Sequence, residues 1–130
     1  MAGNKKDKSV HETIISSFQR VHRKLGHGFL EKVYVNALQI ELEKACLNCL
    51  CHLPIQVYYD RQKISDFYAD LIVDEEVIIK VVSADTIHPS DEKELLNTMK
   101  ATEVSRGIVL NFGMQAQHVI REMEKEVENV

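Results

Sequence analysis

The sequence contains no tryptophan, only two prolines and three cysteines, and no long apolar run. Because a membrane-spanning helix needs about 20 consecutive apolar residues, we expect no segment to cross a membrane. An odd number of cysteines argues against a disulfide framework. Residues 1–8 are polar and lack the apolar stretch of a secretory signal. These absences predict a soluble protein of the cytoplasm.

The overall composition is that of an ordinary globular protein. The chain has 130 residues, of which 45% are hydrophobic and 28% are charged, and this length fits a single domain. We expect residues 1–8 to form a disordered tail and residues 9–130 to form one domain. The net charge of −4 weighs against strong nonspecific binding of nucleic acid, which depends on Lys and Arg side chains at phosphates. A nucleic-acid partner is therefore allowed but not favoured.

The three cysteines cluster at Cys46, Cys49 and Cys51, directly before His52. Structural zinc sites usually use two separated pairs of ligands, and the sequence has no second pair. We therefore predict reduced, partly buried thiols and no metal at this cluster, and we assign it no role.

Two helices are predicted in the first third of the chain. Ser9 and Glu12 form a capping box, and apolar residues at helical spacing follow until Gly26 ends the first helix. A second helix is predicted after Gly28, over about residues 29–45.

Three β-rich runs follow, at Leu53–Tyr59, Phe67–Val73 and Val77–Ser83. Asp74–Glu76 separates the second run from the third, which predicts a hairpin. The third run is apolar on both faces, as in a central strand covered by helices.

The last third of the sequence predicts a helix over residues 91–104, a short buried strand over residues 107–111 and a final amphipathic helix over residues 115–128. The final helix is predicted from the spacing of its apolar residues, Val119, Ile120, Met123 and Val127. The predicted fold is α/β with the element order ααβββαβα, in which helices flank a mixed central sheet.

Gly28, Glu31 and Tyr34 have the spacing G-x-x-E-x-x-Y. Four further segments accompany this motif, in chain order: YADLIV at 68–73, LLN at 95–97, KAT at 100–102 and LNFG at 110–113. Together these segments resemble the GxxExxY protein family, over about residues 10–113. That family belongs to the PD-(D/E)XK nuclease-like superfamily, and the resemblance implies its αβββαβ core. The predicted element order contains this core, with one helix before it and one after.

The resemblance also implies a catalytic pattern for cutting phosphodiesters. Carboxylates would hold Mg²⁺, and a lysine would lie near the attacking water. An Asp on one strand is followed by Glu-x-Lys on the next, and a helix Glu and a later Gln assist. Asp70 matches the first carboxylate and Glu31 matches the helix carboxylate, but Lys80 stands in place of the strand Glu and Val82 in place of the Lys.

Two further departures fall on the next helix, where Glu94 replaces the Gln and Thr98 replaces a frequent aromatic residue. A three-residue hairpin connection would place Asp70 directly opposite Lys80, with about 5 Å between their Cβ atoms. The ammonium would then take over the electrostatic role of a metal and repel Mg²⁺. We predict an Asp70–Lys80 salt bridge within a buried polar network that includes Glu31 and Glu94. Tyr34, one turn after Glu31, would position it or make a structural contact.

The favoured hypothesis is a catalytically degenerate nuclease fold, leaning away from an enzyme, that needs no cofactor and acts by binding or self-association. Its candidate contact surfaces are the Leu53–Tyr59 strand and the final helix, and a homo-oligomer is the expected assembly.

Two alternatives remain open. The first is an active nuclease with a migrated site, in which Glu31, Asp70 and Glu94 hold Mg²⁺ or Mn²⁺. The second is a non-catalytic nucleic-acid-binding module. Its phosphate contacts would be basic residues, namely Lys80, Arg20, Arg23 and Lys24.

Overall fold

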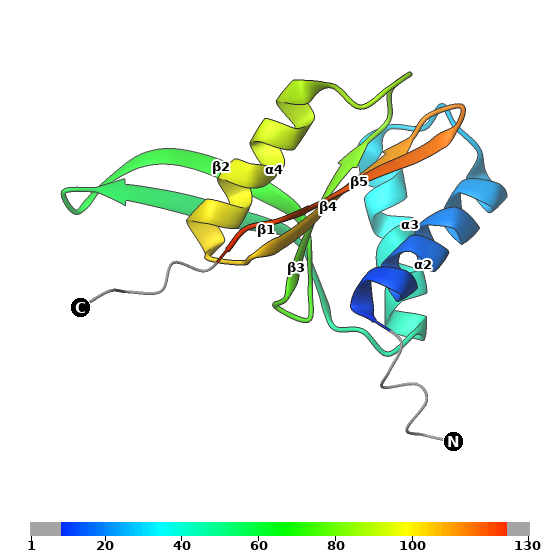
Figure 1. The fold of residues 1–130 in the computed structure, drawn as a ribbon, viewed down its shortest axis with the longest axis horizontal. Helices are drawn as coiled ribbons and strands as arrows, with labels where there is room; N and C mark the ends of the chain where they lie inside the picture. The colour runs from blue at the N-terminus through cyan, green and yellow to red at the C-terminus, as the bar shows by residue number, and fades with distance from the viewer. Residues whose placement is uncertain (1–8, 125–130) are drawn as a thin grey trace.

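The structure is a computed structural model that describes residues 9–124. The predicted tail over residues 1–8 lies outside the described residues. Two helices cover one face of a central sheet and a third covers the other (Figure 1). The helices are α2 (Val10–Leu25), α3 (Glu31–Lys44) and α4 (Pro89–Thr102).

The sheet has five strands, which lie in the order β1-β2-β3-β4-β5. They are β1 (Cys49–Tyr59), β2 (Gln62–Val73), β3 (Val77–Val82), β4 (Arg106–Phe112) and β5 (Ala116–Glu122). Only the β3–β4 pair is parallel, and the other neighbours are antiparallel. The α/β class and the mixed sheet are confirmed, with the element order ααβββαββ.

The predicted final helix over residues 115–128 is wrong up to residue 124, because β5 pairs with β4 from Ala116 to Glu122. Val119 and Ile120 point to opposite faces of the sheet, as strand geometry requires; Val119 is half-buried and Ile120 is exposed. β4 is almost wholly buried, and β5 satisfies the backbone groups that β4 would otherwise leave unpaired at an edge. Val127, which completed the helical pattern, lies outside the described residues.

The predicted helices match closely at their starts. Ser9 and Glu12 form the predicted reciprocal capping box, and Gly26 ends α2 with a φ of 68°. α3 begins at Glu31, two residues later than predicted. α4 begins at Pro89, because proline fits the first turn of a helix, where its missing N–H would have no partner.

The hairpin between β2 and β3 has the predicted connection, with Val73 opposite Val77. Asp74 and Glu75 both have positive φ values, 52° and 57°, and this pair of left-handed residues turns the chain tightly. The β1–β2 hairpin is longer than predicted. Its strands meet at a two-residue turn, Asp60-Arg61.

The apolar core forms two clusters, one on each face of the sheet. Phe18, Leu38 and Leu71 belong to the cluster under α2 and α3, and the other cluster lies under α4.

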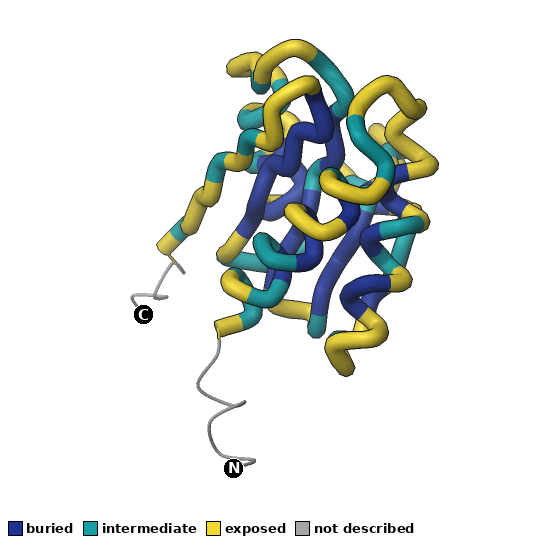
Figure 2. Tube along the Cα trace, turned by 90° about the vertical axis from the view of Figure 1, so that its right-hand side faces the viewer, coloured by how far each residue is buried: buried dark blue, intermediate teal, exposed yellow. Residues whose placement is uncertain are grey.

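 In this second cluster, the buried α4 residues Leu95 and Met99 pack with Ile78 of β3. In Figure 2 the buried strands run between outer layers of exposed residues. Among the described residues, no helix is long and apolar enough to cross a membrane.

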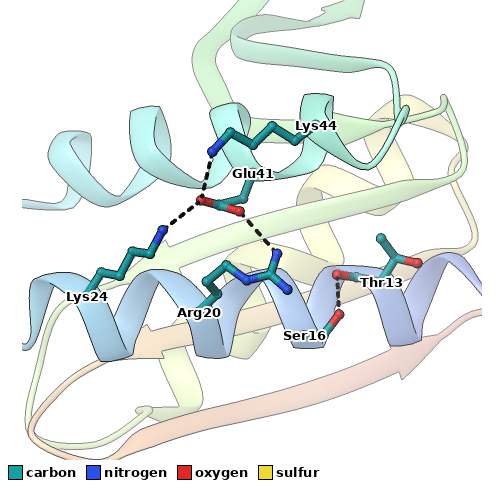
Figure 3. A network of polar contacts seen from close by, with 6 residues as sticks. All are labelled: Thr13, Ser16, Arg20, Lys24, Glu41 and Lys44. Atoms are coloured by element: carbon teal, nitrogen blue, oxygen red, sulfur yellow. Dashed lines mark hydrogen bonds and ion pairs between the residues drawn. The ribbon is translucent and has the colours of Figure 1, made fainter.

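A buried carboxylate joins α2 to α3. Glu41 on α3 is only 7% exposed and accepts a hydrogen bond from Arg20 on α2 at 3.2 Å. Lys24 and Lys44 lie 3.9 and 3.8 Å from its other carboxylate oxygen (Figure 3). The hydrogen bond from Arg20 lowers the pKa of Glu41, and the lysine charges act in the same direction. This network fixes the helix pair that carries the G-x-x-E-x-x-Y motif.

Candidate functional site

Three of the five predicted site residues line a pocket between β2, β3 and α4, and the other two, Glu31 and Tyr34, are not part of its lining. The pocket has a volume of ≈ 210 Å³. Its lining includes Asp70 from β2, Lys80 from β3 and Glu94 from α4. The aromatic residues Phe67 and Tyr68 also line it, and sequence reasoning had not placed them there. The site therefore lies where the two strands separate, beside the middle of α4.

Asp70 lies at the point where β2 leaves β3. The paired residues of these strands end at Leu71 and Ile79, so the backbone N–H of Val81 lacks the partner that a continued ladder would supply. The Oδ2 atom of Asp70 accepts a hydrogen bond from this N–H at 2.8 Å. Because Val81 is fully buried, this bond satisfies a donor that water cannot reach.

Lys80 lies on β3, directly before Val81, and its ion pair differs from the predicted one. Its Nζ atom lies 3.9 Å from Oε1 of Glu94. Among the described residues, no Asp70–Lys80 ion pair occurs within 4.0 Å. The predicted salt bridge is therefore not formed, because Asp70 bonds to the backbone and Lys80 extends toward α4. The Lys80 side chain is 24% exposed and that of Glu94 is 63% exposed.

The G-x-x-E-x-x-Y motif builds the turn that brings Glu31 to this site. Gly28 has a φ of 110°, a conformation that residues with a Cβ rarely adopt. The Tyr34 hydroxyl donates to the Gly26 carbonyl at 2.6 Å and accepts from the Phe29 N–H at 3.2 Å. Tyr34 is fully buried, so it holds the turn from inside, and its polar contacts are with the α2–α3 loop.

Glu31 is the first residue of α3 and approaches the end of β3. Ser83 directly follows β3, and its hydroxyl donates to the Phe29 carbonyl, two residues before Glu31, at 2.9 Å. Partial burial raises the pKa of Glu31. The Lys80 charge opposes this shift and the Asp70 charge adds to it. Glu31, Asp70 and Lys80 therefore share one electrostatic environment.

The residues present do not fit a divalent cation. Across residues 9–124, no group of three or more His, Cys, Asp and Glu side chains is arranged so that it could hold a metal ion. Glu31, Asp70 and Glu94 are thus not gathered as the migrated site would require. One Asp70 oxygen bonds to Val81, and the ammonium of Lys80 lies beside Glu94, where it would repel a second cation.

The basic residues of the nucleic-acid alternative are not brought together. Lys80 lines the pocket beside α4, whereas Arg20 and Lys24 lie on α2, on the other face of the sheet (Figure 1). Both are paired with Glu41. Arg23 is exposed on the same helix.

The three cysteines are free. Cys46 is exposed, Cys49 is buried and Cys51 is partly buried. Burial raises the pKa of Cys49 to about 12, so this thiol stays protonated at neutral pH and is a poor nucleophile or metal ligand.

Two residues that support the site were missed from the sequence. Asn111 is fully buried, and its side chain exchanges two 3.0 Å hydrogen bonds with the backbone of Ala84. A Cβ at Gly113 would lie 2.2 Å from the Ala84 carbonyl. Both residues therefore fix the loop that follows β3. Both residues belong to the LNFG segment, which could have indicated that they matter for the site. The sequence does not indicate that Ala84 is their partner.

Comparison with known proteins gives one match. Residues 8–123 match the family model described as PD-(D/E)XK nuclease superfamily. No curated protein and no solved structure matches the chain.

Proposed function

The chain belongs to the PD-(D/E)XK nuclease superfamily, and from that premise we propose that it is a catalytically degenerate member of the GxxExxY type. In this proposal it acts in the cytoplasm by binding or self-association and needs no metal or other cofactor. Residues 9–130 would form its single domain.

The observation that carries the proposal is the arrangement around Lys80. A positive side chain stands where the superfamily pattern has a carboxylate, and it lies 3.9 Å from Glu94. Val82, two residues later, supplies no amine for the chemistry and is almost fully buried. The scaffold that positions Glu31 and Asp70 is retained, while the groups that would hold a metal and assist the attacking water are replaced.

The direct test combines a metal titration with nuclease assays on the full chain. We expect no binding heat with Mg²⁺ or Mn²⁺ in calorimetry, and no cutting of single- or double-stranded DNA or RNA. The matched control is Asp70→Ala, which removes the remaining strand carboxylate. Metal-dependent cutting by the natural chain that disappears in Asp70→Ala would overturn the proposal and favour the migrated site.

A further inference from the structure

Four exposed apolar side chains lie at one end of the sheet. Leu30 is 81% exposed and Met114 is 74% exposed, and Phe29 and Val33 are also exposed. We call these four residues the apolar knob. Phe29, Leu30 and Val33 lie on the α2–α3 loop and the start of α3, and Met114 lies in the β4–β5 turn. Ser83 and Ala84 lie between these two segments, because the Ser83 hydroxyl bonds to the Phe29 carbonyl and Ala84 lies against Gly113. Exposed apolar residues that stand singly are ordinary, whereas a contiguous exposed apolar patch is a candidate contact surface.

Basic residues flank the apolar knob. Arg23, Lys24 and Lys32 are all exposed and come from the same stretch of chain. Two acidic residues lie nearby. Glu31 begins α3 directly after Leu30, and Asp85 lies on the loop after β3. Lys24 also pairs with Glu41, so Arg23 and Lys32 are the exposed basic side chains that this surface offers to a partner, in a chain whose net charge is −4.

The opposite end of the sheet has a hollow of ≈ 470 Å³. We call it the acidic hollow. Its apolar residues are Leu50, which is 54% exposed, and Ile72, which is only 6% exposed and lies at its floor. Its acidic residues are Asp74, Glu75 and Glu76, and Asn48 completes the lining. Ligand sites span about 300–1,000 Å³, so the hollow has room for the Phe29 and Leu30 side chains.

The two surfaces lie at opposite ends of β3. The acidic hollow includes the turn before Val77, and the apolar knob lies beside Ser83, directly after Val82. In Figure 1 the β2–β3 turn lies at the bottom, and the α2–α3 loop and the β4–β5 turn lie at the upper right. One molecule therefore cannot bring its own knob to its own hollow.

We propose that the apolar knob of one copy docks into the acidic hollow of a second copy, so that the protein assembles head to tail. Apolar side chains would meet Leu50, while Arg23 and Lys32 would face Asp74, Glu75 and Glu76. Such a contact joins two different surfaces, so each added copy leaves one surface of each kind free and the chain of copies can grow. This inference rests on the proposed non-catalytic function and names its partner.

The free edge of the sheet at β1 is a poorer contact. Pro54 lies within β1 and has no N–H to donate to an added strand, and edge prolines oppose strand-to-strand association. The Leu53–Tyr59 strand, one of the contact surfaces predicted from the sequence, is therefore less suited to self-association than the two ends of the sheet.

Sedimentation velocity of the full chain tests the assembly. Each surface is small, so we expect a weak contact and use protein concentrations from about 10 μM to 1 mM. The mean mass should rise with concentration and fall when salt is raised, because the charged contacts are exposed to solvent. A strict monomer over the whole range would overturn the inference.

Variants separate a head-to-tail contact from other modes. Leu30→Asp damages only the knob, and Glu75→Lys with Glu76→Lys damages only the hollow. Each variant alone should be monomeric. A mixture of the two retains one intact knob and one intact hollow, so it should form a dimer and nothing larger. Ile64→Asp is the matched control, since Ile64 is an exposed β2 residue outside both surfaces, and this variant should assemble like the natural chain.

Either variant assembling like the natural chain would contradict the inference, as would a mixture that stays monomeric or grows beyond a dimer. These results are independent of the nuclease assays. A monomer that cuts no nucleic acid overturns the docking inference alone, whereas metal-dependent cutting overturns the proposed function.

Discussion

At the scale of single residues, Asp70 has a structural task that the catalytic pattern does not require. Its carboxylate accepts the Val81 N–H at the place where β2 and β3 separate. A buried N–H without a partner costs free energy comparable to a lost hydrogen bond. Asp70 can therefore be retained for folding even where the metal chemistry is lost.

Substitution of Asp70 tests this role. Asp70→Ala leaves the buried Val81 N–H without an acceptor, and we expect the free energy of unfolding to fall by about 1–3 kcal/mol. Asp70→Asn keeps a side-chain oxygen that can accept the bond, so its loss should be smaller. Urea denaturation of both variants measures the difference. Equal losses for the two variants would show that the hydrogen bond is not what Asp70 contributes.

The site could be predicted from the sequence only in part. The hairpin register at Asp74–Glu76 gave the strand positions, and Asp70, Lys80 and Glu94 do line one pocket. The predicted Asp70–Lys80 ion pair was wrong, because the register of the β2–β3 pair fixes the positions of the Cβ atoms but not the partners of the side chains. A long lysine side chain can reach several carboxylates, and a nearby backbone N–H competes for Asp70.

At the scale of elements, Glu41 couples the stability of the α2–α3 pair to pH. Its pKa is lowered in the folded protein, first by the Arg20 hydrogen bond. A group with a lowered folded pKa stabilises the fold above its unfolded pKa, about 4.3 for Glu. That contribution is lost as the pH falls through the folded pKa.

Glu41→Gln should therefore lower the free energy of unfolding at pH 7. The loss should be limited to about 1 kcal/mol, because solvent screens the charges of the exposed partner side chains, Arg20, Lys24 and Lys44. The difference from the natural chain should close as the pH falls below about 4.3. Chemical denaturation from pH 7 to pH 3 measures both effects. Glu43→Gln, an exposed change on the same helix, should show neither, and a constant difference at every pH would contradict the assignment.

Most elements follow from local patterns, and the exception has a physical cause. The capping box at Ser9 and the hairpin at Asp74–Glu76 are local signals, and both are confirmed. The strand β5 does not follow from local sequence. Its residues are stabilised by pairing with β4, and the short stretch of sequence around Val119 and Ile120 does not include β4. Tertiary context overrides an amphipathic helical pattern in such cases.

At the scale of the whole molecule, the scaffold and the metal chemistry are separable. The Tyr34 turn, the Asn111–Ala84 bonds and the Asp70–Val81 bond hold the loops around the pocket. None of them depends on Lys80. A change at Lys80 should therefore alter what the pocket binds without altering the fold, and a return of the carboxylate should return affinity for a metal.

Lys80→Glu makes this prediction concrete. The substitution removes the ammonium and adds a carboxylate beside Asp70, so Mn²⁺ should bind at least about tenfold more tightly than to the natural chain, which is 1.4 kcal/mol. Lys80→Gln is the matched control, because it removes the ammonium without adding a carboxylate, and its affinity should rise less. Calorimetry at constant pH measures all three proteins. Circular dichroism checks that each remains folded, because like charges crowd the pocket when the metal is absent. If the natural chain binds Mn²⁺ as tightly as Lys80→Glu, then Lys80 is not what keeps the ion out, and the degenerate site must have another cause.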